Sequence, residues 1–164
     1  MNILITGYHG FVGQNILPYL KEKGHMVYGL GRSGDYVWDD LDGDRIPHVD
    51  AIIHLAGKAH DTKNQTEADV YFKVNRDLTM KVFSYFLNHQ DIKKFIFFSS
   101  VKAAADQVAG EILTEDVIPT PKGPYGESKA EAEKQLNDVW KQATSTHTDG
   151  RQLYILRPCM MNGP

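Results

Sequence analysis

The 164-residue chain has a single cysteine and no long apolar run. Because Cys159 has no second cysteine to pair with, the composition is typical of a reducing compartment. No stretch approaches the about 20 consecutive apolar residues that a membrane-spanning helix needs. The first residues also differ from a secretory leader, which has a charged segment followed by an apolar core. We therefore expect a cytoplasmic protein.

Neither sign of charge predominates, with 18 Lys and Arg against 21 Asp and Glu and a formal net charge of −3. A basic stripe interleaved with aromatic residues is also missing, so nucleic acid is not an expected partner. The seven histidines form no convincing metal-ligand pair, and we expect no metal site. With 41% hydrophobic residues, the chain is long enough for one domain and too short for two.

The N-terminus reads as a strand, a tight turn and a helix. An apolar run over residues 2–6 leads into Gly7-Tyr-His-Gly-Phe-Val-Gly13, and residues 14–20 follow with helical apolar spacing. Glycines three apart, at Gly7, Gly10 and Gly13, let a turn close, let backbone N–H groups approach an anion, and let the helix pack on the strand. A flexible loop is the alternative for a glycine-rich stretch alone. The flanking strand and helix favour a nucleotide-binding turn, with Phe11 and Val12 opening the helix.

Strands and helices alternate along the rest of the chain. Such alternation predicts an α/β fold, a Rossmann-like doubly wound parallel sheet with strand order 3-2-1-4-5-6 and helices on both faces. The expected strands are residues 2–6, 26–30, 36–38, 51–55, 95–99 and 153–156, and the later helices are residues 68–89 and 125–143.

Tyr125 and Lys129 lie four residues apart and so face the same side of a helix. A lysine cation beside a phenol favours the phenolate, which makes the pair suited to proton transfer near neutral pH. The spacing alone is also common on ordinary helix surfaces. Two further segments add weight: the serines Ser99 and Ser100 end one apolar run, and small residues up to Gly57 end another. Ligands of a parallel sheet bind at these carboxyl ends.

Together these residues resemble the extended short-chain dehydrogenase/reductases, specifically the NAD(P)-dependent nucleotide-sugar epimerase/dehydratase group of the UDP-glucose/galactose 4-epimerase type. The matching motifs run in family order through the chain: Thr6-Gly-x-x-Gly-Phe-x-Gly13, His54-Leu-Ala-Gly57, Val74-Asn75, Phe95-Ile-Phe-Phe-Ser-Ser100, Tyr125-x-x-x-Lys129 and Leu156-Arg-Pro158.

The resemblance implies a role for each matched residue. Ser100 would hydrogen-bond the reacting sugar oxygen, Tyr125 would be the acid or base there, and Lys129 would hold the cofactor ribose and lower the pKa of the tyrosine. Ser99 would be a structural neighbour. Asn75 would be structural or a proton relay. The remaining cofactor contacts would come from Leu55, Ala56 and Gly57 along the dinucleotide and from Asp40 and Leu41 at the adenine.

The end of the second expected strand departs from the family pattern. NAD-preferring members carry an acidic residue where this chain has Gly31, and Arg32 follows. A guanidinium can pair with a ribose 2′-phosphate that a carboxylate would repel, so the sequence favours NADP over NAD. The alternative is that Arg32 stacks on adenine or lies in solvent.

Three functions remain open from the sequence. The overall motif similarity favours a nucleotide-sugar 4-epimerase, whereas Arg32 favours an NADPH-dependent 4-ketoreductase. The segment 101–105 lacks the acidic pair of family dehydratases, which makes dehydration the less favoured reaction. A non-catalytic NADP-binding sensor is the third function, but Ser100, Tyr125 and Lys129 are all present.

The resemblance also implies a second region. Family members continue into a C-terminal substrate-binding part of comparable size, so we expect residues 1–164 to be an NAD(P)-binding domain without that part. The expected substrate is a nucleotide sugar, with UDP-sugars favoured. A homodimer through the helices that contain Asn75 and Tyr125 is expected from the same resemblance.

Overall fold

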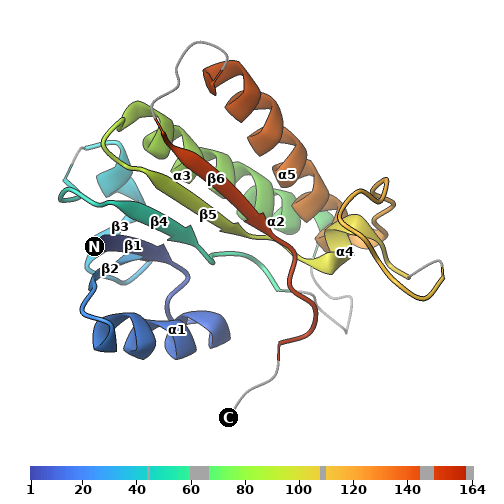
Figure 1. Ribbon diagram of the computed structural model, residues 1–164, viewed down its shortest axis with the longest axis horizontal. Helices are drawn as coiled ribbons and strands as arrows, with labels where there is room; N and C mark the ends of the chain where they lie inside the picture. Colours follow the sequence, from blue (N-terminus) through green and yellow to red (C-terminus); the bar gives the residue numbers. More distant parts are fainter. Residues whose placement is uncertain (44, 60–66, 108–109, 145–149, 162–164) are drawn as a thin grey trace.

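Six parallel strands form one sheet in the order β3-β2-β1-β4-β5-β6 (Figure 1). The computed structural model describes residues 1–43, 45–59, 67–107, 110–144 and 150–161. The strand order confirms the order predicted from the sequence. The strands are β1 (Asn2–Thr6), β2 (Met26–Gly31), β3 (Tyr36–Val37), β4 (Ala51–His54), β5 (Lys94–Phe98) and β6 (Gln152–Leu156).

Helices cover both faces of the sheet, which confirms the doubly wound architecture. One face carries α1 (Phe11–Glu22), and the other carries α3 (Leu78–Asn88) and α5 (Gly123–Thr144), as Figure 1 shows. The helix α2 (Ala68–Phe72) and the π-helical segment η2 (Lys73–Asp77) precede α3 without a break. Two short helices complete the described part, the 3₁₀ helix η1 (Trp38–Leu41) and α4 (Val101–Ala104).

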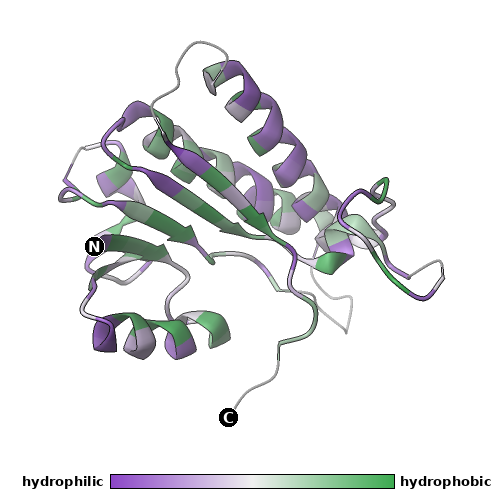
Figure 2. Cartoon of the chain, viewed as in Figure 1, coloured by the Kyte–Doolittle hydropathy of each residue, from purple (hydrophilic) through white to green (hydrophobic). Residues whose placement is uncertain are grey.

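The core has two layers because successive side chains of a strand point to opposite faces. Ile3 and Ile5 of β1 pack toward α1, whereas Leu4 between them packs toward α3 and α5. The larger layer contains the fully buried Phe83, Phe95 and other aromatic rings. Figure 2 shows the same division, with apolar residues concentrated in the strands and hydrophilic residues along the outer side of α5.

The structure differs from the predicted elements in three places. The helix expected over residues 68–89 contains the π-helical turn η2, where the N–H of Leu78 donates to the carbonyl of Lys73, five residues back. Trp38, expected in the third strand, begins η1 instead. The helix α4 was not predicted; Ser100 caps it by accepting a hydrogen bond from the Lys102 amide at 3.2 Å. Each feature depends on contacts that hydrophobic periodicity does not encode.

Candidate functional site

The three glycines of the first turn meet different surroundings. Gly7 has φ +70°, and a methyl group there would lie 2.6 Å from the Ala56 amide nitrogen. At Gly13 a methyl group would lie 2.4 Å from the Cα of Tyr8. The nearest atom to a methyl group at Gly10 is the Gly7 carbonyl oxygen, at 3.2 Å. Gly7 and Gly13 therefore permit close packing of the chain, and Gly10 leaves room for a ligand.

Helix α1 begins directly after Gly10 and has no side-chain hydrogen bond at its N-terminus. Its first N–H groups, which include those of Phe11 and Val12, have no partner within the helix, and the helix dipole gives this end a partial positive charge. A 12-residue helix that begins at a glycine turn without a side-chain cap is well suited to bind an anion such as a pyrophosphate.

A cavity of about 630 Å³ opens beside this turn. Six of the residues that the sequence predicted for the cofactor line it: Gly7, Gly10, Arg32, Leu55, Ala56 and Gly57. Seven do not line it, namely Phe11, Val12, Gly13, Asp40, Leu41, Tyr125 and Lys129. The cavity is also lined by five residues that were not predicted as cofactor contacts: Tyr8, His9, Ser33, Trp38 and Lys58.

Asp40 and Leu41 are occupied by other contacts. The Asp40 carboxylate accepts a 2.7 Å hydrogen bond from the Val37 amide and pairs with Arg45 at 2.8 Å, while Leu41 is buried in the larger core layer. Their contact with adenine stays a prediction. Trp38 is the aromatic side chain of this segment at the cavity, and its position directly after β3 is a signal that could have indicated it.

The segment with Arg32 is fastened to the glycine turn by neighbouring residues. Tyr8 donates a hydrogen bond to the Ser33 carbonyl oxygen, and His9 Nε2 lies 3.2 Å from the same oxygen. Burial and the nearby Asp35 carboxylate raise the pKa of Tyr8, which keeps its phenol protonated as a donor. Arg32 itself is exposed at the rim, so its charge is available to a ligand.

Lys129 is buried at the carboxyl ends of the central strands. Its Nζ donates a 2.8 Å hydrogen bond to the Phe98 carbonyl and lies 4.7 Å from the centre of the Phe97 ring. A methyl group at Gly57 would lie 3.3 Å from Nζ, which places the ammonium beside the cavity wall. Burial lowers the pKa of Lys129 to about 8, and Glu133 opposes this shift.

Tyr125 lies in the first turn of α5, which packs tightly on α4. A methyl group at Gly126 would lie 2.6 Å from the Lys102 carbonyl, so the helix with Tyr125 and the segment with Ser100 meet closely. The Tyr125 and Tyr71 rings meet edge to face, with their centroids 6.3 Å apart. Ser99 is buried, and its hydroxyl has no hydrogen-bond partner among the described residues. The catalytic roles of Ser100, Tyr125 and Lys129 stay predictions.

Asn75, at the centre of η2, joins the cavity wall to α5. Its Oδ1 accepts from the Lys58 amide at 2.7 Å, and its Nδ2 donates to the Lys58 carbonyl at 3.2 Å and to Ser128 Oγ at 3.0 Å. Both amide protons are therefore used, which agrees with the structural role rather than with a proton relay. Ser128 in turn donates to the Tyr125 carbonyl at 2.9 Å.

The described residues contain no cluster of three His, Cys, Asp or Glu side chains placed to hold a metal ion. None of the helices described is long and apolar enough to cross a membrane.

Comparisons with known proteins place this geometry among its relatives. A family model described as the NAD dependent epimerase/dehydratase family matches residues 3–164. The chain is 28% identical to a UDP-glucose 4-epimerase of Vibrio cholerae over 99% of its own length and 52% of that protein. It is 29% identical to a GDP-6-deoxy-D-mannose reductase of Pseudomonas aeruginosa, with 99% and 53% covered.

Solved structures agree with the sequence relatives. The UDP-glucose 4-epimerase of Thermotoga maritima, solved with UDP-glucose, superimposes with a TM-score of 0.79 at 26% identity, covering 96% of this chain and 55% of that one. RMD from Pseudomonas aeruginosa, complexed with NADPH, has a TM-score of 0.76 at 26% identity, with 97% and 54% covered. The chain thus spans about half the length of the relatives that it matches.

Proposed function

The chain belongs to the NAD dependent epimerase/dehydratase family, and we propose that it is the cofactor-binding part of an NAD(P)-dependent nucleotide-sugar 4-epimerase. The observation that carries the proposal is the position of Lys129. Its buried ammonium lies beside Gly57 at the wall of the cavity that the glycine turn forms. Burying an ammonium costs free energy, and a role toward a ligand in the neighbouring cavity would account for that cost.

The residues present fit a dinucleotide. The turn from Gly7 to Gly13 and the uncapped start of α1 would hold the pyrophosphate, and Leu55, Ala56 and Gly57 would line its path. Lys129 would donate to the ribose hydroxyls. When bound, the nicotinamide would supply hydride transfer at a sugar carbon. A cavity of about 630 Å³ is within the size range of cofactor sites.

Proton transfer would fall to residues of α4 and α5. Tyr125 would take the proton of the sugar hydroxyl when that carbon is oxidised and return it when the ketone is reduced. Ser100 would hydrogen-bond the same oxygen. The nearby Lys129 cation would favour the phenolate of Tyr125 by charge. The tight contact between Gly126 and Lys102 supports this arrangement, because it holds the two segments together.

We further propose that the cofactor is NADP rather than NAD. Arg32 is exposed at the cavity rim, no acidic side chain stands at Gly31, and Tyr8 and His9 hold the neighbouring carbonyl in place. A preformed cationic rim matches a 2′-phosphate.

An NADPH-dependent 4-ketoreductase is the second candidate function. Its support is Arg32 together with the relative that is a GDP-6-deoxy-D-mannose reductase and the neighbour solved with NADPH. A non-catalytic NADP sensor is the third, and the retention of Ser100, Tyr125 and Lys129 counts against it.

The substrate would be a nucleotide sugar, with UDP-sugars favoured. We propose that the sugar is held by a second region outside residues 1–164, and that the helices with Asn75 and Tyr125 form a homodimer interface. Positioning of the substrate and exclusion of water would both depend on that second region.

The function is tested by assaying UDP-glucose and UDP-galactose interconversion with NAD⁺ or NADP⁺, using this chain and one extended by its native downstream residues. The extended chain should interconvert them, and Tyr125→Phe should reduce its kcat by about 10² to 10⁴. If only a keto-sugar is reduced, with NADPH consumed, the ketoreductase replaces the epimerase. Equal activity of the short chain would contradict the proposal that a second region holds the sugar.

A further inference from the structure

Glu133 is a buried acidic residue one helical turn after Lys129 on α5. It is 4% exposed, as is Lys129, and residues four apart lie on the same side of a helix. Among the residues that the structure describes, no other carboxylate is buried. A buried carboxylate costs free energy unless it is paired and hydrogen-bonded, so its retention needs a reason.

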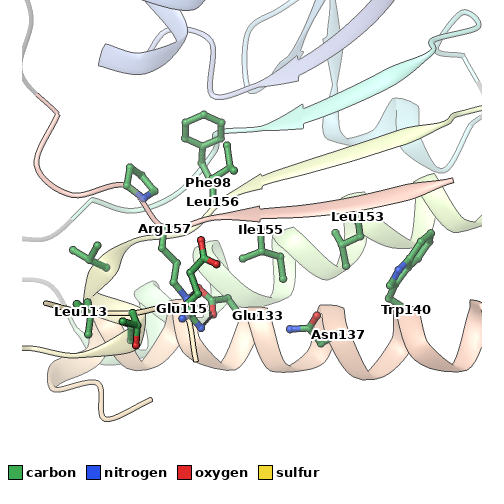
Figure 3. Close-up of a pocket in the computed structure, with 14 residues that line it drawn as sticks. Phe98, Leu113, Glu115, Glu133, Asn137, Trp140, Leu153, Ile155, Leu156 and Arg157 are labelled. Atoms are coloured by element: carbon green, nitrogen blue, oxygen red, sulfur yellow. Dashed lines mark hydrogen bonds and ion pairs between the residues drawn. The ribbon is translucent and has the colours of Figure 1, made fainter. Parts of the chain in front are cut away.

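Arg157, which directly follows β6, supplies the pairing. Its Nε lies 3.1 and 3.0 Å from the two carboxylate oxygens of Glu133, and its Nη2 lies 2.6 Å from Oε2. Figure 3 shows the two side chains pointing toward each other between β6 and α5. The fork of the guanidinium fixes the carboxylate in one orientation, more firmly than a single contact would.

The other groups that face Lys129 cannot replace this carboxylate. From β4 comes His54, which is neutral because burial and the Lys129 charge lower its pKa to about 3. From β5 come the Phe98 carbonyl and the Phe97 ring, which are uncharged. From η2, the uncharged amide of Asn75 lies near the ammonium, since a methyl group at Gly57 would lie 3.0 Å from Asn75 Oδ1 and 3.3 Å from Lys129 Nζ. Tyr125 lies one turn before Lys129 on α5 itself.

We propose that Glu133, locked in place by Arg157, is a positioning residue that keeps the Lys129 ammonium charged and directed at the Phe98 carbonyl. The inference rests on the proposed function only in giving that ammonium a role toward the cofactor. Burial disfavours the charged form of a lysine, and a fixed carboxylate nearby restores it. The Arg157–Glu133 pair thereby connects the end of β6 to the candidate site.

Removing either charge of the Arg157–Glu133 pair should shift the pKa of Lys129 in a direction that can be measured. Desolvation lowers the pKa of Lys129 to about 8, and the Glu133 charge acts in the opposite sense. Removing the carboxylate leaves desolvation unopposed, so Lys129 should lose its proton at a lower pH. Removing Arg157 takes a cation away and frees the carboxylate to face Lys129, so the proton should be held to a higher pH.

The test is an NMR titration of the full 164-residue chain labelled with ¹³C at the lysine Cε, with the Lys129 signal assigned through Lys129→Arg. Glu133→Gln should lower the titration midpoint of Lys129 by about one pH unit, and Arg157→Gln should raise it. Glu131→Gln is the matched control, because Glu131 lies on the same helix and pairs with Arg76 instead. The Lys129 titration midpoint in Glu131→Gln should equal that in the parent chain.

An unmoved midpoint in folded Glu133→Gln, with only a lower melting temperature, would show a merely structural pair and overturn the proposal. If Glu133→Gln does not fold, a Lys129 midpoint that is lowered or unchanged in Arg157→Gln would also overturn the proposal.

NADPH titration separates this proposal from the proposed function. With a midpoint one unit lower, Glu133→Gln should bind about threefold less tightly than the parent near pH 7.5 and equally near pH 6. No NADPH binding by the parent, together with a shifted midpoint, would sink the proposed function alone.

Discussion

His54 Nδ1 lies 2.7 Å from Thr6 Oγ1, and the partners of its two ring nitrogens together fix the tautomer of the imidazole. Thr6 Oγ1 accepts from the Ala56 amide at 3.0 Å, and its single proton is free to go to His54. On the other side, Thr79 Oγ1 donates its proton to the Asn75 carbonyl at 2.8 Å and so accepts from His54 Nε2 at 2.9 Å. The ring is therefore neutral, with its proton on Nε2.

This network joins the ends of β1 and β4 to the start of α3. Because every member is satisfied, it holds the Ala56 wall of the cavity in a fixed place relative to Asn75. His54 carries no charge and does not line the cavity beside the glycine turn, so it contributes to that site by position alone.

Acid should destabilise the fold through His54. Its pKa is about 3 when folded and 6.5 for the free group, so between these values the unfolded chain binds a proton that the folded chain does not. The free energy of unfolding should therefore fall as the pH falls from 6.5, by up to about 1.4 kcal/mol per pH unit from this one group. Urea unfolding at pH 7, 6, 5 and 4 measures the slope.

The exposed His48 provides a contrast of opposite sign. Hydrogen bonding to Asp91 raises the pKa of His48 in the folded chain, so its contribution is present below pH 6.5 and is lost as the pH rises through the raised pKa. His48→Gln should therefore lower the free energy of unfolding at pH 6 and lower it less at pH 9.

The His54 prediction has its own control variant, His54→Gln. If the free energy of unfolding of this variant changes with pH between 6.5 and 4 as steeply as that of the parent, the assignment to His54 is refuted.

Two glycine substitutions should separate folding from binding. Gly13→Ala places a methyl group 2.4 Å from the backbone of Tyr8 and should destabilise the fold by about 1–3 kcal/mol. Gly10→Ala, at φ −74°, should cost less than about 1 kcal/mol but weaken NADPH binding about tenfold, because the methyl group enters the space left for the pyrophosphate.

Thermal unfolding and fluorescence titration of reduced cofactor measure the two effects. Gly24→Ala is a control for a glycine away from the cavity, since no atom lies within 4 Å of its added methyl group, although its φ of +78° adds strain. Unchanged affinity in Gly10→Ala would place the pyrophosphate elsewhere.

Arg32 should decide the choice between the two cofactors. Charge-assisted hydrogen bonds to a phosphate are worth about 1.5–3 kcal/mol, so the parent should bind NADPH about 10- to 100-fold more tightly than NADH. Arg32→Ala should abolish the difference by weakening NADPH alone. Arg45→Ala is the matched control, because Arg45 pairs with Asp40 and does not line the cavity. Equal affinities in the parent would remove the basis for NADP.

The sequence by itself determined the architecture and the glycine turn. Runs such as residues 2–6 and 94–98 alternate with helical segments, and this local pattern predicts a doubly wound parallel sheet. The predicted strand order also agrees with the observed one. The spacing of Gly7, Gly10 and Gly13 and that of Tyr125 and Lys129 are also local, so both motifs could be recognised without coordinates.

Only the tertiary structure decided which side chains meet. It places Trp38 at the cavity. It also pairs Asp40 with Arg45, although the sequence predicted that Asp40 contacts the adenine. It also widened a helix at η2 so that Asn75 reaches Lys58 and Ser128. The pairing of Glu133 with Arg157 spans 24 residues. Such contacts depend on how the elements pack, and hydrophobic periodicity sets the elements without setting the partner of each polar group.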